Sequence, residues 1–142
     1  MACAPGGGGR ATPDSAWPAQ AEARTTVGTV EYGLEVEAWR SFQPVAGEQG
    51  DPLLAAVRLT SAQPIPPDLA LGRVRLQRGA DSWGGTLAEE STRAASPTTI
   101  EFMLRDGPRW TAGDSITVMV ELVRGGSRVA VLGLRTVIAR VD

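Results

Sequence analysis

Two pairs of carboxylates are the residues whose type and spacing could support acid–base chemistry. Glu35 and Glu37 lie two positions apart, so on a β-strand they occupy the same face, and Glu89 and Glu90 are adjacent. Paired carboxylates act as acid and base only where their surroundings separate their pKa values. We interpret the face of Glu35 and Glu37 as solvated and the Glu89–Glu90 pair as a surface edge, so neither pair predicts catalysis.

Histidine is absent from the sequence, as are lysine and asparagine, and all fourteen basic residues are arginine. Because histidine is the commonest general base and metal ligand near neutral pH, Ser-His-Asp, Cys-His and His-zinc sites are excluded within these residues. Asp51, Asp81, Asp106 and Asp114 lie next to or near Gly or Pro, as turn residues do, and no aspartate cluster has the spacing of a calcium loop. We predict a protein that is not an enzyme and uses no metal or cofactor.

Tryptophans at positions 17, 39, 83 and 110 are the next candidates for binding. Exposed Trp rings stack on sugars or anchor protein interfaces. Trp39 falls on the polar phase of its segment, and Trp83 precedes Gly84 and Gly85, where backbone could approach a ligand. The simpler alternative is that these rings pack at sheet ends as lids on a core.

The charge and length of the chain limit its partners. A formal net charge of -2 supplies no field for nucleic acid, and the length of 142 residues fits one domain with a tail. We expect the basic residues Arg73, Arg75 and Arg78 to form cross-strand charge pairs, not a nucleic-acid site. No apolar run approaches the roughly 18 residues of a membrane span.

The sequence divides into a tail and a domain. Residues 1–24, MACAPGGGGRATPDSAWPAQAEAR, are mostly Ala, Gly and Pro and show neither the period of a strand nor that of a helix. We interpret residues 1–24 as a flexible tether and residues 25–142 as one folded domain.

An alternation of apolar and polar residues runs through the domain and predicts β-strands. It begins in VGTVEYGLEVEAWR, recurs at 53–61, 71–79 and 98–107, and is weaker at 81–90, whose glycine pair suggests a bulge or short edge. No segment carries a helical stripe. The residues expected to face a core are Val30, Tyr32, Leu34, Val36, Ala38, Leu53, Ala55, Val57, Leu59, Val74, Leu76, Ile100, Phe102 and Leu104. We predict an all-β fold, a single antiparallel two-sheet sandwich of about seven strands, with a barrel as the alternative.

The C-terminal segment SITVMVELVRGGSRVAVLGLRTVIARV predicts a hairpin that turns at Gly125 and Gly126. The expected pairs are Val123 with Arg128, Leu122 with Val129 and Val120 with Val131, which would place Ile116, Val118, Val120, Leu122, Val129 and Val131 on one face. The opposite face would carry Met119, Val123, Ala130, Leu132 and Leu134. That face is too apolar for free exposure, so we expect the tail, a neighbouring element or a partner to cover it.

Part of this segment resembles a known fold family. RWTAGDSITVMVELV is similar to the corner between strands E and F, and to strand F, of immunoglobulin-like and fibronectin type III modules. The resemblance implies that Trp110 caps the core and that Gly113 and Asp114 form the turn. The paired cysteines and the characteristic tyrosine of that family are missing, and the family hosts many functions.

The opening residues resemble the start of mature bacterial lipoproteins. Ala2, Cys3 and the run APGGGG that follows fit the small residue, the acylated cysteine and the tether of that family, although its apolar signal region and preceding leucine are absent. The resemblance implies lipid attachment at Cys3, whereas the alternative is an unmodified thiol in a disordered tail.

The function that these observations favour is a non-enzymatic, extracytoplasmic accessory or structural subunit of a bacterial cell-envelope assembly. It would be anchored to the membrane only through the lipid on Cys3 and would act through contacts with a protein partner, for which Trp39, Trp83, Met119, Val123, Leu132 and Leu134 are the candidate residues. The alternative is a module that binds carbohydrate or cell-wall polysaccharide through Trp39 and Trp83. A cytoplasmic enzyme or inhibitor is the third reading.

Overall fold

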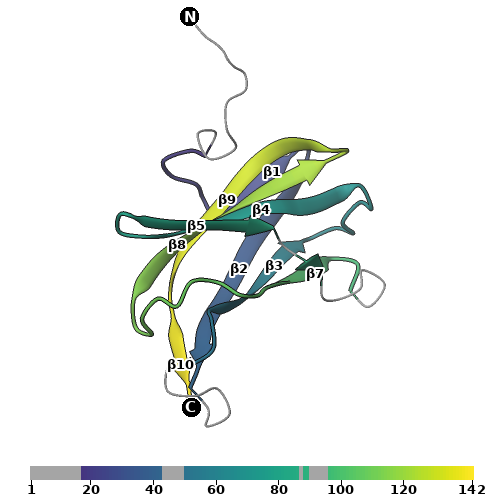
Figure 1. Cartoon of the computed structure of the whole chain (residues 1–142). Helices are drawn as coiled ribbons and strands as arrows, with labels where there is room; N and C mark the ends of the chain where they lie inside the picture. Colours follow the sequence, from purple (N-terminus) through teal and green to yellow (C-terminus); the bar gives the residue numbers. More distant parts are fainter. Residues whose placement is uncertain (1–16, 43–49, 87, 90–95) are drawn as a thin grey trace, which may run out of the picture.

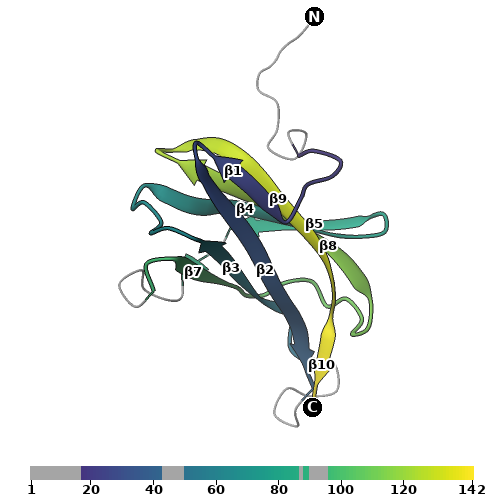
Figure 2. The same ribbon diagram turned by 180° about the vertical axis from the view of Figure 1, so that it is seen from behind.

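The computed structural model describes residues 17–42, 50–86, 88–89 and 96–142, and in these residues the chain forms two β-sheets packed face to face. Figure 1 shows the two layers crossing each other, and Figure 2 shows them from behind. The predicted all-β two-sheet sandwich is confirmed. In this part of the chain no helix is long and apolar enough to cross a membrane. Cys3 lies outside the described residues.

The first sheet has the order β1-β2-β3-β7-β6, and β10 pairs with β2 as well. Adjacent strands in this sheet are antiparallel, except that β10 runs parallel to β2. Its strands are β1 (Arg24–Val27), β2 (Val30–Ser41), β3 (Leu54–Ser61), β6 (Ala88–Glu89), β7 (Thr99–Leu104) and β10 (Ala139–Val141). We call it the six-stranded sheet.

The second sheet has the order β5-β4-β8-β9 and is antiparallel throughout. Its strands are β4 (Leu69–Arg78), β5 (Asp81–Thr86), β8 (Ser115–Arg124) and β9 (Ser127–Val137). The chain passes from β5 at the edge of this sheet to β6 at the edge of the other. The weak segment predicted at 81–90 is thus a pair of short edge strands.

Alternation along the strands creates the core between the sheets. In β2 the even positions face inward, so Tyr32, Leu34 and Ala38 are buried, and the same phase buries Val57 and Leu59 of β3. The inward positions predicted in β3, β4 and β7 are likewise buried. No buried side-chain nitrogen or oxygen in the described ranges lacks a hydrogen-bond partner.

The first predicted strand is broken into two. Val27 pairs with Val30 across a two-residue turn, and Gly28 takes a φ of 65° there, a conformation that costs glycine little. The alternation in the sequence continues across this turn, which is why it predicts one strand where the structure has the hairpin β1–β2.

The predicted register of the C-terminal hairpin is wrong beyond its first pair. Val123 does pair with Arg128, but Leu122 pairs with Ala130 and Val120 with Leu132, because β9 contains a bulge at Val129. The extra residue exchanges the two faces of β9. Leu132 is therefore fully buried in the core, while Val129 is 42% exposed.

Residues 17–23 lie across the outer face of the second sheet and along its β9 edge. The Gly133 N–H donates to the Glu22 carbonyl at 2.9 Å, and the Leu34 N–H of β2 donates to the Ala23 carbonyl at 2.8 Å. Trp17 is buried, and the Arg73 guanidinium stacks over its ring. The sequence assigned this part of the chain to the tether. It covers apolar surface of the C-terminal hairpin around Met119, so the tail is the cover found among the three that were expected.

The corner before β8 has the predicted form. Trp110 is buried in the core, and Gly113 has a φ of 99° in the turn that Asp114 closes by donating its N–H to the Thr111 carbonyl. A positive φ at the third turn position requires glycine or asparagine in practice. The expectation for Trp110, Gly113 and Asp114 is confirmed.

Candidate binding surface on the six-stranded sheet

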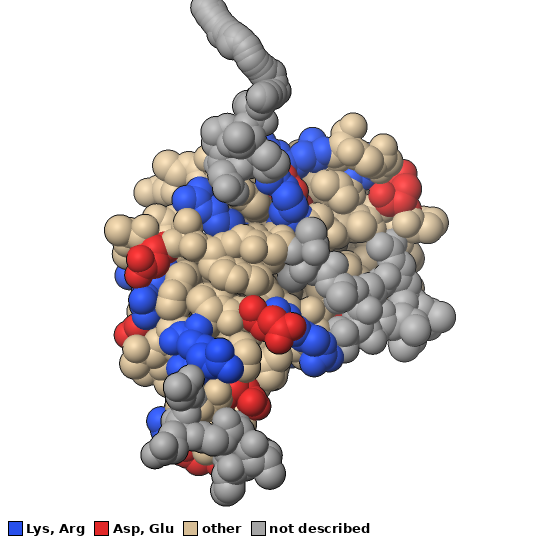
Figure 3. Space-filling view, viewed as in Figure 1, with Lys and Arg blue, Asp and Glu red and all other residues tan. Residues whose placement is uncertain are grey.

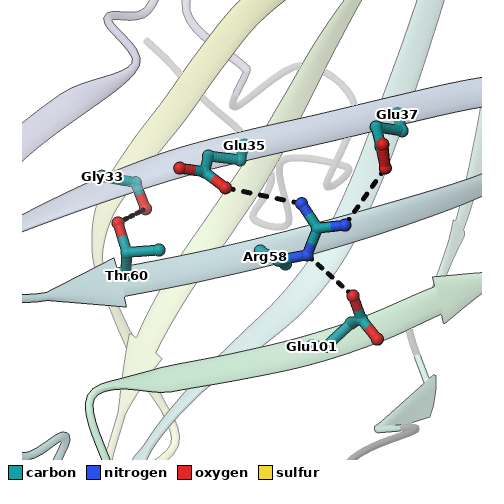
Figure 4. Close-up of polar contacts among 6 residues, drawn as sticks. All are labelled: Gly33, Glu35, Glu37, Arg58, Thr60 and Glu101. Atoms are coloured by element: carbon teal, nitrogen blue, oxygen red, sulfur yellow. Dashed lines mark hydrogen bonds and ion pairs between the residues drawn. The ribbon is translucent and has the colours of Figure 1, made fainter.

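The outer face of the six-stranded sheet carries an ionic cluster centred on Arg58. Cross-strand register places Glu35 of β2 and Glu101 of β7 on either side of Arg58 of β3. Nε of Arg58 donates to Glu101 at 2.8 Å, and its terminal nitrogens donate to Glu37 at 3.1 Å and Glu35 at 3.4 Å. Figure 4 shows the three carboxylates converging on one guanidinium. Opposite charges on adjacent strands stabilise their pairing.

The cluster has more negative than positive charge. The hydrogen bonds that Arg58 donates to Glu37 and Glu101 hold the pKa of Arg58 above its usual value. Glu35 and Glu37 remain about 60% exposed at the side chain, as their predicted solvated position requires. Among these four described residues three carboxylates surround one guanidinium, and the exposed negative charge of the cluster lies on Glu35 and Glu37. Thr60 fills the space over Gly33 nearby and donates to its carbonyl (Figure 4).

An apolar area adjoins this cluster on the same face. Trp39 is half-buried and sits opposite Leu54 in the β2–β3 register, and Met103 of β7 sits opposite Ala56 of β3. Leu54 and Met103 are also only half-buried. Because opposed residues on neighbouring strands lie about 5 Å apart at Cβ, these side chains form one patch. We call it the Trp39 patch, and Glu37 of the ionic cluster precedes it by two residues on β2.

Trp83 lies elsewhere. It is on β5 opposite Leu76, so its ring faces inward and packs against the core from the edge of the second sheet. The ring also covers Gly85, where an added Cβ would lie 2.7 Å from it. The glycine pair thus makes room for this ring. Trp83 and Trp39 belong to different sheets, and of the two only Trp39 lies on an outer face.

The four candidate contact residues on the hairpin are distributed between core and surface. Leu132 is in the core, Leu134 packs against it, and Val123 is half-buried. Met119 points to the outer side of the second sheet, where it lines a hollow of about 440 Å³ together with Ala19 and Ala21. These residues are not brought together on one exposed surface.

A second ionic group lies on the outer side of the second sheet. Glu121 is buried and accepts from the Arg73 side chain and, at 3.1 Å, from the Arg73 backbone N–H; Arg128 lies 3.6 Å away. A bulge in β4 between Leu71 and Val74 turns Arg73 toward this carboxylate. The hydrogen bonds from Arg73 lower the pKa of Glu121, although burial opposes them. Because Arg73 also stacks on Trp17, we interpret this group as structural.

Cross-strand pairing of the basic residues is confirmed for two of them. Arg73 pairs with Glu121, and Arg78 pairs with Asp81 and Asp114. The expected partners, Glu89 and Glu90, have no described side chains. On the face seen in Figure 3, basic and acidic side chains lie next to one another in small groups, and uncharged surface separates these groups.

Sequence reasoning missed Arg58, Glu101, Leu54 and Met103 as parts of this face. Each occupies the polar phase of an alternating segment, which indicates an outward position. The strand order and register that bring them beside Trp39 and Glu37 are not visible in any one segment. No group of three or more His, Cys, Asp or Glu side chains in the described ranges is arranged so that it could hold a metal ion.

Comparison with known proteins yields no relative: no family model matches the chain, and neither the curated proteins nor the solved structures contain a match.

Proposed function

We propose that the chain is a non-enzymatic binding module with an immunoglobulin-type sandwich. Support comes from the order of the strands: β2-β3-β7-β6 in one sheet corresponds to strands A, B, E and D of that fold, and β5-β4-β8-β9 corresponds to C′, C, F and G. Proteins with this fold have many functions, and each function depends on the residues at particular surfaces of the sandwich. The fold alone therefore indicates no partner.

The observation that carries the binding proposal is the Trp39 patch beside the negative excess around Arg58. Half-buried tryptophan with aliphatic neighbours is the composition of interface centres, and a charged border steers and orients a partner. The partner that fits is a protein whose surface offers basic side chains around an apolar centre. In this proposal Trp39 is the anchor, and Glu35 and Glu37 select the charge of the partner.

Site-specific photo-crosslinking tests the proposal. A photoreactive amino acid replaces Glu37 beside the patch or, as a control, Arg135, an exposed residue of β9. In the cells that express the protein naturally, we expect a discrete crosslinked species from position 37 and none from position 135. Adding Trp39→Ala should remove that species while the circular dichroism of the purified chain stays unchanged.

Absence of a discrete species from position 37, or equal crosslinking from both positions, would count against a partner on this face. Charge reversal gives an independent check: Glu35→Arg with Glu37→Arg should weaken the contact, because both carboxylates border the patch and their side chains are exposed.

The location proposed from the sequence is the cell envelope, with the module anchored through a lipid on Cys3. Its support is the resemblance of the opening residues to lipoproteins, together with the Ala-, Gly- and Pro-rich composition of the residues that follow Cys3. Intact mass of the protein made from its natural gene tests it. A diacyl or triacyl mass on Cys3, lost in Cys3→Ser, supports the anchor, whereas a free thiol refutes it.

Polysaccharide binding is the second candidate, favoured by the position of Trp39 next to carboxylates on an open sheet face. Trp83 faces the core edge, so a two-tryptophan platform would need the ring to leave its place. A glycan that changes the tryptophan fluorescence of the chain, but not that of Trp39→Ala, would support this candidate over a protein partner.

A further inference from the structure

A pocket of about 360 Å³ opens at the end of the sandwich where β10 runs beside β2. In Figure 1 this is the lower end of the molecule, at the C-terminus and away from β1. Its walls come from segments distant in sequence: Arg40, Phe42, Ala112, Gly113, Ile138 and Arg140. The pocket lies apart from the Trp39 patch, because Arg40 and Arg140 share the inward phase of their strands whereas Trp39 has the outward phase.

Arg40 is fixed in the wall of this pocket. Only 6% of the residue is exposed, and its guanidinium donates to two backbone carbonyls, that of Asp51 at 2.9 Å and that of Trp110 at 3.2 Å. A buried guanidinium keeps its charge in surroundings of reduced dielectric, because the pKa of arginine lies far above neutral pH. It therefore contributes a fixed positive potential to the pocket.

Arg140 supplies accessible donors at the same place. Its guanidinium lies 4.0 Å from the centre of the Phe42 ring, and that of Arg40 lies 4.8 Å from the same centre. Nε of Arg140 donates to Asp142 at 2.8 Å, and half of the side chain is exposed. Among the described residues no other hydrogen bond engages this guanidinium, so its two terminal nitrogens remain available.

Among the described residues, two further arginines act on Arg40. Burial lowers the pKa of Arg40, the positive charges of Arg109 and Arg140 lower it further, and the negative charge of Asp51 opposes them. Placing the guanidinium groups of Arg40 and Arg140 at the one ring of Phe42 brings two positive charges together, and this repulsion is unfavourable unless a bound anion offsets it. A single guanidinium can bind a carboxylate or phosphate at two points through two parallel N–H donors.

We propose that this pocket binds an oxyanion, a carboxylate or phosphate group, held by Arg140 in the potential of Arg40 and Arg109. Phe42, Ala112 and Ile138 form an apolar wall, so the natural ligand is a small organic anion or the acidic group of a larger molecule with a short carbon portion in contact with that wall. The site is independent of the proposed partner surface, and either can fail alone.

Titration of the full chain with sodium phosphate and, separately, with sodium acetate tests the site by ¹H–¹⁵N NMR. Ionic strength is held constant with chloride. We expect saturable shifts of the Gly113 backbone amide and the Arg140 Nε–H, and at least about tenfold weaker binding in Arg140→Gln, the loss expected for a charge-assisted hydrogen bond. Arg24→Gln is the matched control, because it removes an exposed arginine, paired with Glu31, near the opposite end of β2.

The anion that binds more tightly identifies the ligand class, phosphate or carboxylate. Shifts that rise linearly without saturation, or equal affinities in the wild type and Arg140→Gln, would overturn the site. Arg140 is exposed, so its substitution leaves the core intact, and an unchanged spectrum outside the pocket verifies that the variant is folded.

Discussion

At the scale of single residues, the Glu121–Arg73 pair shows how position decides the energetic role of a charge. Both residues belong to alternating strands on which many charges are solvated, yet Glu121 is buried and is bonded through both the side chain and the backbone of Arg73. Removing one member of a buried pair leaves the other desolvated without its partner. Exposed pairs such as Arg24–Glu31 lack this penalty.

We therefore predict that Glu121→Gln lowers the free energy of unfolding by about 2 kcal/mol at pH 7, the scale of a lost hydrogen bond to a charged group. The pKa of Glu121 is held below its usual 4.5 in the folded state, so its contribution is complete above that value and disappears as the pH falls through the lower folded-state pKa. Urea unfolding at pH 7 and pH 3 should show the gap between wild type and variant narrowing at pH 3.

Glu31→Gln is the matched control for that experiment, because Glu31 makes a single exposed pair and should change the unfolding free energy by no more than about 0.5 kcal/mol. A gap for Glu121→Gln that stays constant between pH 7 and pH 3 would show that the charge of Glu121 is not what stabilises the fold.

At the scale of elements, the bulge in β9 decides which side chains of the hairpin enter the core. A shift of one residue exchanges the faces of a strand. Without the bulge Val129 and Val131 would be inside; with it Leu132 is inside and Val129 outside. We predict that Leu132→Ala costs about 3 kcal/mol in unfolding free energy. Val129→Ala should cost less than about 0.5 kcal/mol. Chemical denaturation measures both losses of unfolding free energy. A larger loss for Val129→Ala than for Leu132→Ala would indicate that β9 pairs with β8 without the bulge.

Residues 17–23 form a segment that is held by few contacts. One of these contacts is the hydrogen bond that the Gly133 N–H donates to the Glu22 carbonyl. An added Cβ at Gly133 would lie 3.0 Å from that of Ala21. We predict that Gly133→Val displaces the segment, exposes Trp17 and costs roughly 1 to 3 kcal/mol, the range for overpacking. Tryptophan emission should shift to longer wavelength, and the shift should vanish when Trp17→Phe is added.

Arg135→Val is the control for this displacement, because Arg135 is an exposed residue two positions further along β9. It introduces the same side chain at a position that already carries a Cβ atom, so no Cβ atom is added beside Ala21, and its emission should match that of the wild type. A similar shift in both variants would mean that the emission reports a general change in β9.

At the scale of the whole molecule, the two sheets share one core, so they should unfold together. Tyr32, Leu59 and Phe102 of the six-stranded sheet belong to the same buried cluster as Leu76, Val118 and Leu132 of the second sheet. We predict one cooperative transition in which far-ultraviolet circular dichroism and tryptophan fluorescence coincide. Two separated transitions would show that the sheets are stabilised independently.

The sequence by itself determined the strands and most of their inward faces. A period of two is a local property: once a segment is extended, its side chains alternate, and the apolar phase must leave water. That reasoning located β3, β4 and β7, the inward phase of β2, and the turn at Gly113, where a positive φ requires glycine. It also indicated that Trp39 faces outward.

Only the tertiary structure decided which strands are neighbours and in what register. Those choices depend on contacts between residues far apart in the chain, and they produced the β9 bulge, the meeting of Arg58 with three carboxylates and the cover over Met119 by residues 17–23. The pocket of Arg40 and Arg140 arises in the same way. Neither arginine is distinguished by the pattern of its own segment. The parallel pairing of β10 with β2 brings both guanidinium groups to the ring of Phe42.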